Sequence, residues 1–378
     1  YISEKRDEAI RLLRQQMDSG LKANRDNMLL KLGQLYAEKY MELSYRENEV
    51  FSQQLSKKEK GAKLDQSRSK RYLKDALGLF YKLEKEYPQH PKRDEIFYFI
   101  GFVEAESGNQ TKGSRYLERV VKEFPRSRKF EEAAIYLGDY YFEKHKFKDA
   151  RDKYSLVLRR SDTTLKDYAG YKVAWCDLNT GAKEKALKDM KALVDRLAGT
   201  ADQSKFSLRD QALKDLVIFY ADVGSVEDAK NYFIRVQGKE KAMENIKLLA
   251  DFYRTKARDD AAIKAYNIII PESENSPDLP HMYLGLFDSQ ARISKGDAPI
   301  KTLLTAVDKF HPGSDWAKEV EDKDPQAAKS GIEAVASEAE KVAFFHHHAG
   351  QKSASAKHYE YALRLYDSIL KNYPNHPN

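Results

Sequence analysis

The chain has 378 residues, of which 41% are hydrophobic and 33% charged, with 11 Pro and 18 Gly; this balance is typical of a folded, mostly helical protein and excludes a disordered chain. The formal charge of +7 is spread along the sequence, so no concentrated basic tail indicates phosphate binding. The single cysteine, Cys176, excludes an internal disulfide framework and any metal site built from several thiolates.

Residues 1–20 start inside a helical pattern, and no initiator Met precedes them. Ala9 and Leu13 match the second helix of a hairpin whose first helix is missing, so we expect a truncated repeat in a fragment or processed product. Its targeting signal, if it has one, would lie outside this sequence. No apolar run of the roughly 18 residues that a transmembrane helix needs occurs anywhere in the chain.

Residues 21–92 indicate one hairpin with a long insertion. A first helix begins around Gly33, but the small residue expected on the second helix, Ala76, follows much later in the chain. The intervening segment 37–74 consists of helix formers without Pro, so we expect both helices to extend beyond the rest of the protein, with Gly61 near the tip. Five apolar side chains would hold the two arms together: Tyr40, Leu43, Val50, Phe51 and Leu55.

Basic side chains gather around this tip and predict a local positive potential. The set comprises Lys57, Lys58, Lys60, Lys63, Arg68, Lys70 and Arg71. A solvated protrusion explains such a set. The alternative is an interaction with anionic lipid, an acidic protein surface or nucleic acid.

Residues 93–270 form a regular array. Gly138, Ala150 and Tyr154 illustrate its unit: a small residue on a first helix, a small residue on a second helix, then an aromatic one turn later. Helices approach closely only where side chains are small, so these positions mark crossings. The small or crossing positions recur near 101, 138, 174, 217 and 250.

Residues 271–378 form a more degenerate end of the array. Gly285 begins a hairpin that ends near Phe310, and the polar stretch 313–329 precedes a last hairpin. The last hairpin repeats an earlier spacing, since Ala362, Tyr366, Ile369 and Pro374 follow one another as Ala76, Phe80, Leu83 and Pro88 do.

These patterns resemble the tetratricopeptide repeat (TPR), a unit of about 34 residues formed by two antiparallel helices. The resemblance implies an all-α fold, an α–α superhelix of about seven to eight hairpins with one long helical insertion. The Tyr-Pro endings at Tyr87 and Tyr373 are similar to those of bacterial envelope members of this superfamily, such as the lipoprotein of the β-barrel assembly machinery. A periplasmic or envelope-associated protein is therefore expected, with a cytoplasmic one as the alternative.

The resemblance also implies a partner-binding groove on the first helices. The positions that match the family's groove are Tyr98, Phe102, Ile135, Asp139, Phe142, Tyr171, Trp175 and Leu178. Such an aromatic wall would hold an extended or helical peptide, although the same rings could instead pack between adjacent repeats. Further along, matching positions become a mixed-charge surface that includes Glu244, Lys247, Asp251 and Arg254.

No catalytic motif, metal site or cofactor is predicted. The run His346 to His348 points in directions too far apart on a helix to share one ion easily, and Cys176 follows an apolar stretch, which is typical of a buried thiol. We therefore expect a non-enzymatic scaffold that binds a protein or peptide, with a membrane-associated complex as a further candidate partner. Nucleic acid is disfavoured, and no small-molecule substrate is expected. The alternative function is nucleic-acid or anionic-lipid binding through the basic insertion.

Overall fold

The structure is a computed structural model that describes residues 2–20, 23–57, 61–293 and 296–375. Within these ranges all regular elements are helices, and the chain divides into two compact units, Tyr1–Ala182 and Lys183–Asn378. Unit 1 contains α1 (Ile2–Asp18), α2 (Arg25–Ser56), α3 (Ser67–Glu86), α4 (Arg93–Glu106), α5 (Gln110–Glu123), α6 (Phe130–Glu143), α7 (Phe147–Leu158) and α8 (Lys166–Asn179). Unit 2 contains α9 (Lys183–Arg196), α10 (Gln203–Val223), α11 (Val226–Gln237), α12 (Lys239–Thr255), α13 (Asp259–Ile269), η1 (Ile270–Glu272), α14 (Leu279–Ile293), α15 (Ala298–Lys309), α16 (Asp315–Glu321), α17 (Pro325–Ser353) and α18 (Ala356–Asn372).

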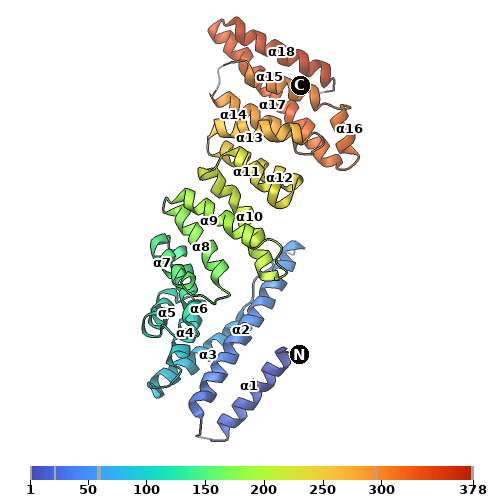
Figure 1. The fold of residues 1–378 in the computed structure, drawn as a ribbon. Helices are drawn as coiled ribbons and strands as arrows, with labels where there is room; N and C mark the ends of the chain where they lie inside the picture. Colours follow the sequence, from blue (N-terminus) through green and yellow to red (C-terminus); the bar gives the residue numbers. More distant parts are fainter. Residues whose placement is uncertain (1, 21–22, 58–60, 294–295, 376–378) are drawn as a thin grey trace. The chain divides into compact units, whose positions relative to one another are not determined.

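In both units, helices that follow one another in the sequence pack side by side. In unit 1, α2 pairs with α3, α4 with α5 and α6 with α7, and each pair packs on the next. In unit 2, α12 pairs with α13, α14 with α15 and α17 with α18 (Figure 1). The predicted all-α array of TPR-like helical hairpins is confirmed.

Small residues sit where the helices of a hairpin cross. A Cβ atom added to Gly101 of α4 would lie 2.7 Å from Cγ of Leu117 on α5, and one added to Gly138 of α6 would overlap the ring of Tyr154 on α7. The absence of a side chain lets the partner helix bring a large residue fully into the core. Burying each such Leu or aromatic side chain contributes about 1.5–3 kcal/mol.

The Tyr-Pro ending after α3 is a tight turn that a histidine completes. The backbone N–H of His90 donates to the carbonyl of Tyr87, and its ring Nδ1 accepts from the N–H of Lys92 at 3.0 Å. The ring is buried, and its Nε2 lies 3.5 Å from a carboxylate oxygen of Asp26 on α2. Because Nδ1 accepts, the proton resides on Nε2 and faces that carboxylate. His90 therefore has a structural role in the turn.

The α2–α3 hairpin contains the segment that sequence analysis identified as an insertion. α2 has 32 residues and α3 has 20, and Gly61 adopts a φ of 85° in the connection between them. Near the body of unit 1, Tyr40 and Leu43 are buried as expected. Val50 and Leu55 differ from the expectation, because 54% and 55% of their surfaces are exposed. α3 begins only at Ser67, so the last turns of α2 run past the point where α3 could cover them.

The end of unit 2 departs most from a regular repeat. After α15, the short helix α16 brings Trp316 into the core, where its Nε1 donates to the carbonyl of Ser276 at 3.0 Å. The last hairpin then begins with α17, whose 29 residues make it about twice as long as the first helices α4, α6 and α8, which have 14 residues each. Asp324 caps α17 by accepting from the N–H of Ala327 at 2.9 Å.

Candidate binding groove

The aromatic residues predicted to line a groove in unit 1 are largely used for internal packing. Tyr98 and Phe102 of α4 are only 6% and 5% exposed, and Leu178 of α8 is also buried. Tyr136 of α6 covers both α4 rings, with centroid distances of 6.3 Å to Tyr98 and 5.6 Å to Phe102. The rings thus fill the space between two adjacent repeats, which is the alternative that the sequence left open.

Asp139 and Phe142 of α6 also serve contacts within unit 1. The Asp139 carboxylate accepts from the hydroxyls of Tyr154 at 2.6 Å and Tyr168 at 3.2 Å, and lies 3.0 Å from Nζ of Lys172. That ammonium group lies 4.2 Å from the ring centroid of Phe142. Burial, together with the hydrogen bond to Asp139, raises the pKa of Tyr154 above its usual range. This network joins three helices, so it stabilises the stack.

Five of the predicted groove residues retain partly exposed side chains, namely Asp139 and Phe142 described above and three more. Ile135 lies on α6, and Tyr171 and Trp175 lie on α8, all half-buried. Tyr171 contacts Tyr168 at a centroid distance of 6.4 Å. The predicted wall is therefore reduced in unit 1 to half-buried side chains on α6 and α8, one of them the Asp139 carboxylate.

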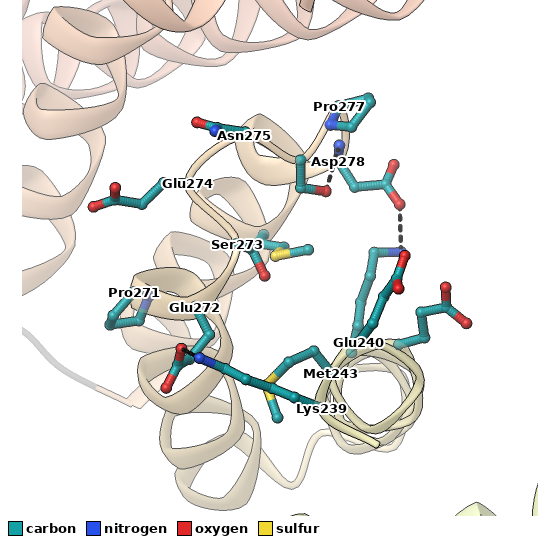
Figure 2. Close-up of a pocket in the computed structure, with 14 residues that line it drawn as sticks. Lys239, Glu240, Met243, Pro271, Glu272, Ser273, Glu274, Asn275, Pro277 and Asp278 are labelled. Carbon is teal, nitrogen blue, oxygen red and sulfur yellow. Dashed lines mark hydrogen bonds and ion pairs between the residues drawn. The ribbon is translucent and has the colours of Figure 1, made fainter. Parts of the chain in front are cut away.

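In unit 2, α12 and α14, which are each the first helix of a hairpin, line two adjoining cavities. One, of about 820 Å³, lies between the N-terminal half of α12 and the connection from α13 to α14 (Figure 2). The other, of about 410 Å³, continues along α12 and α14 and reaches Glu338 of α17. Lys247 and Met282 line both cavities. We call the two together the α12–α14 groove.

Buried thioethers and ion pairs form the larger cavity. Met243 and Met282 are 8% and 5% exposed and supply an apolar surface. Figure 2 shows Lys239 extending from α12 toward the connection, where its Nζ lies 2.6 Å from Glu272. Nζ of Lys247 lies 3.3 Å from Asp278. The ion pairs attach the α13–α14 connection to α12 and thereby define the width of this cavity.

The smaller cavity contains a second acid–tyrosine contact. Asp251 accepts from the hydroxyl of Tyr266 at 2.6 Å, and Arg254 lies 3.3 Å from Asp288 of α14. Nε of Arg254 is buried and has no hydrogen-bond partner among the described residues. It lies 4.0 Å from a carboxylate oxygen of Asp251, so the Arg254 guanidinium is placed between the Asp251 and Asp288 carboxylates.

Acidic side chains outnumber basic ones along the α12–α14 groove. The basic set consists of Lys239, Lys247 and Arg254. The acidic set consists of Glu240, Glu244, Asp251, Glu272, Glu274, Asp278, Asp288 and Glu338. The groove is therefore negative although the whole chain carries a formal charge of +7.

Part of this groove was predictable from the sequence, and the rest was not. Glu244, Lys247, Asp251 and Arg254 were expected on a mixed-charge surface, and all of them line the cavities. Met282 and the connection from α13 to α14 were not anticipated. A sequence signal existed in Pro271 and Pro277, which prevent an α-helix from continuing across this connection, but it does not reveal what the connection faces.

The basic insertion is exposed wherever it can be described. Lys57 and Lys63 lie in the connection between α2 and α3, and Arg68, Lys70 and Arg71 lie on the first turns of α3, all on the surface. Lys58 and Lys60 lie outside the described residues. The cluster follows the chain from the end of α2 into α3.

The histidine run makes separate contacts. His346 contacts His358 of α18, His347 lies 3.4 Å from the hydroxyl of Tyr366, and His348 lies 3.2 Å from Gln351. In the ranges that the structure describes, no three His, Cys, Asp or Glu side chains converge into a set that could hold a metal ion. Among the described helices, none combines the length and apolar character needed to span a bilayer.

The helical hairpins described above give the chain a TPR-like fold. Comparisons with known proteins find similar solved structures. No family model and no curated protein sequence matches it. A tetratricopeptide repeat protein from Parabacteroides merdae is similar at 16% identity, with a TM-score of 0.38, over 73% of this chain and 99% of that one. The C-terminal part of a TPR repeat-containing protein from Cytophaga hutchinsonii is similar at 13% identity, with a TM-score of 0.40, over 81% of this chain and 92% of that one. The Rap conjugation gene regulator of plasmid pLS20, solved with the Phr* peptide, is similar at 13% identity, with a TM-score of 0.34, over 90% and 96% of the two chains.

Proposed function

We propose that this protein is a non-enzymatic scaffold that binds a segment of another protein in the α12–α14 groove. The observation that carries the proposal is the pair of adjoining cavities along the first helices of unit 2, which share Lys247 and Met282. Methionine side chains adapt to apolar anchors of different shape. A peptide that lies along helices of this kind is a common mode of recognition.

The charge of the groove defines the partner further. Glu240, Glu244 and Glu274 are exposed, and no ion pair holds them among the described residues. A segment with Lys or Arg on both sides of an apolar residue would complement these carboxylates while its apolar side chain contacts Met243 and Met282. The partner segment is therefore expected to be net basic.

Affinity isolation from native cells tests this proposal. The triple variant Glu240→Gln, Glu244→Gln and Glu274→Gln should lose the partner that the wild-type chain retains, while helical content and melting temperature stay the same. The matched control neutralises three exposed carboxylates of unit 2 outside the groove, Glu227, Glu333 and Glu360, and should retain the partner. Cross-linking should attach a basic segment of the partner to α12 or α14. Identical captured proteins for both triple variants would contradict the assignment.

The assembly in which this scaffold acts is proposed to belong to the bacterial envelope. The support is the similarity of the Tyr-Pro hairpin endings to envelope members of the superfamily. Cell fractionation of the native organism with an antibody against this chain tests the location. Recovery with cytoplasmic markers alone would reject the envelope assembly and leave the groove proposal intact.

A second function is favoured by the exposure of the basic insertion. Lys57, Lys63 and Arg68 are accessible on one protruding hairpin, so this cluster could bind anionic lipid or nucleic acid. Binding to vesicles with anionic lipid or to duplex DNA should then fall steeply with salt and disappear when Lys57, Lys58, Lys60 and Lys63 are replaced by Gln. Binding that is insensitive to both changes would exclude this function.

A further inference from the structure

The last hairpin exposes an apolar stripe along α18. Leu363 and Leu370 are 60% and 73% exposed, and Tyr359 and Tyr366 also retain exposed surface. These four residues follow one another at steps of 4, 3 and 4 residues and therefore share one side of the helix. We call them the α18 face. α18 packs against α17 and α15, and no helix follows it in the described part of the chain.

Second helices elsewhere in the chain show what covers the same positions. The register of each is fixed by the small residue at the crossing of its hairpin, which is Ala76 in α3, Gly113 in α5, Ala150 in α7, Ala262 in α13 and Ala362 in α18. Counted from that residue, the α18 face occupies positions −3, +1, +4 and +8. These positions can therefore be compared between helices.

Position −3 contacts the first helix of the next hairpin. In unit 1, Nε2 of Gln110 on α5 donates to the carboxylate of Glu143 on α6 at 3.3 Å. In unit 2, the carboxylate of Asp259 on α13 lies 2.7 Å from the guanidinium of Arg292 on α14. The position is thus used alike in both units.

Positions +1 and +4 face the same neighbour. At +1, Nε of Arg151 on α7 donates to the carboxylate of Asp177 on α8. At +4, the ring of Phe80 on α3 stacks on the ring of Phe99 on α4, with 5.2 Å between the centroids. The side of a second helix that corresponds to the α18 face is therefore the side on which the following first helix packs.

We propose that the α18 face docks an amphipathic helix of a partner protein, in the place that a following first helix takes elsewhere in the array. Because Tyr359, Leu363 and Tyr366 are all apolar or aromatic, the partner helix contributes an apolar stripe. An aromatic residue of that helix contacts Tyr366, as Phe99 contacts Phe80. The α18 face shares no residue with the α12–α14 groove, so this inference stands apart from the proposed function.

Asp367 specifies a charge on the partner helix. It occupies position +5, is exposed and has no ion pair among the described residues. At +5 in α3, the hydroxyl of Tyr81 donates to Glu104 of α4. At +5 in α5, Glu118 accepts from the hydroxyl of Tyr141 of α6 at 3.0 Å. An acid at this position thus receives a donor from the following helix, so the partner helix is expected to carry Lys or Arg opposite Asp367.

A soluble probe for this docking is the segment 91–109, which contains α4, joined to ubiquitin through a Gly-Ser linker. Biolayer interferometry with the full chain should show that the Glu104→Lys probe binds about threefold or more tightly than the unmodified probe, which brings an acid against Asp367. Adding Phe99→Ala to the Glu104→Lys probe should weaken binding about tenfold, because the aromatic contact with Tyr366 is lost.

Variants of the full chain locate the probe. Leu363→Gln with Leu370→Gln should weaken binding of the Glu104→Lys probe about tenfold and leave the melting temperature unchanged, because both side chains are exposed. The matched control, Phe206→Gln with Leu248→Gln, removes two exposed apolar side chains from α10 and α12 and should keep the affinity. Asp367→Lys should reverse the preference between the unmodified and the Glu104→Lys probe.

Three results would overturn the proposal: no binding of the Glu104→Lys probe, unchanged binding to the Leu363→Gln, Leu370→Gln chain, or a preference that Asp367→Lys does not reverse. Sedimentation of the chain alone tests the other occupant. A dimer that dissociates in the Leu363→Gln, Leu370→Gln chain would assign the α18 face to a second copy instead of a partner helix.

Discussion

The hydroxyl of Tyr154 donates a 2.6 Å hydrogen bond to the carboxylate of Asp139 and so joins the second helix of one hairpin to its first. Tyr266 makes the same bond, also 2.6 Å, to Asp251 in unit 2. In both hairpins the acid directly follows the small residue at the helix crossing, Gly138 or Ala250. The close approach that the small residue permits is what brings the hydroxyl within reach of the next side chain.

Replacing Tyr154 by Phe should destabilise unit 1 by about 1–2 kcal/mol, because a hydrogen bond to a charged acceptor is lost while Asp139 keeps Tyr168 and Lys172 as partners. Urea unfolding followed by circular dichroism measures this change. Tyr45→Phe is the control. Because Tyr45 is 72% exposed, this substitution should leave the stability of unit 1 unchanged. Equal midpoints for the two variants would contradict a stabilising role of the bond.

Alanine should have opposite effects at two glycines of neighbouring first helices. Gly138→Ala places a Cβ into the Tyr154 ring and should destabilise by about 1–3 kcal/mol. Gly170 of α8 has no atom within 4 Å of an added Cβ, so Gly170→Ala should stabilise by about 0.5–1 kcal/mol through helix propensity. Thermal unfolding of both variants checks the signs. A gain in stability from Gly138→Ala would show that the ring can move aside.

Cys176 should be unreactive in the native protein. It is fully buried, and burial raises the pKa of its thiol to about 12, so the thiolate that attacks a disulfide reagent is scarce at neutral pH. A chromogenic disulfide reagent should label one thiol per chain in denaturant and almost none without it. Rapid native labelling at pH 7.5 would contradict this environment.

Acidification should weaken the α17–α18 hairpin. Burial and His358 lower the pKa of His346 below its usual value of about 6.5, so the unfolded chain takes up this proton first as the pH falls. The stability contributed by neutral His346 is present above that usual value and is lost as the pH drops through the folded pKa. The charged groups nearby are Glu338, Lys341 and Lys357, together with Asp297.

A pH series of thermal unfolding midpoints for the wild type and His346→Asn measures this contribution. The midpoint of the wild-type chain should fall more between pH 7.5 and pH 5 than that of the variant, which has no ionisable group at this position. Parallel curves would mean that His346 titrates alike in the folded and unfolded states.

The helical repeat was predictable because its causes are local. Gly138, Ala150 and Tyr154 recur at fixed spacing in the sequence, and the structure places the same residues at a helix crossing. Spacing also identified Lys247 and Arg254 as first-helix residues on one surface. These inferences need only the period of an α-helix and the size of side chains.

Which side chains are buried between repeats and which line a cavity was not predictable in the same way. The position of Phe102 on a first helix says nothing about Tyr136, whose ring comes from the next repeat and covers it. Met282 became part of a cavity because the α13–α14 connection bends back toward α12, where Lys239 and Lys247 hold it. Both outcomes depend on contacts between repeats, which a pattern within one repeat does not encode.

The long α2–α3 hairpin illustrates a consequence of packing each helix mainly against its neighbours in sequence. α2 continues for several turns beyond the part of α3 that covers it, yet Gly33 still receives Phe80 at the same kind of crossing as in the shorter hairpins. Length added at the open end of a hairpin leaves the contact at its base unchanged. One hairpin of such an array can therefore become longer, or gain charged residues at its tip, while the interfaces between the other hairpins stay the same.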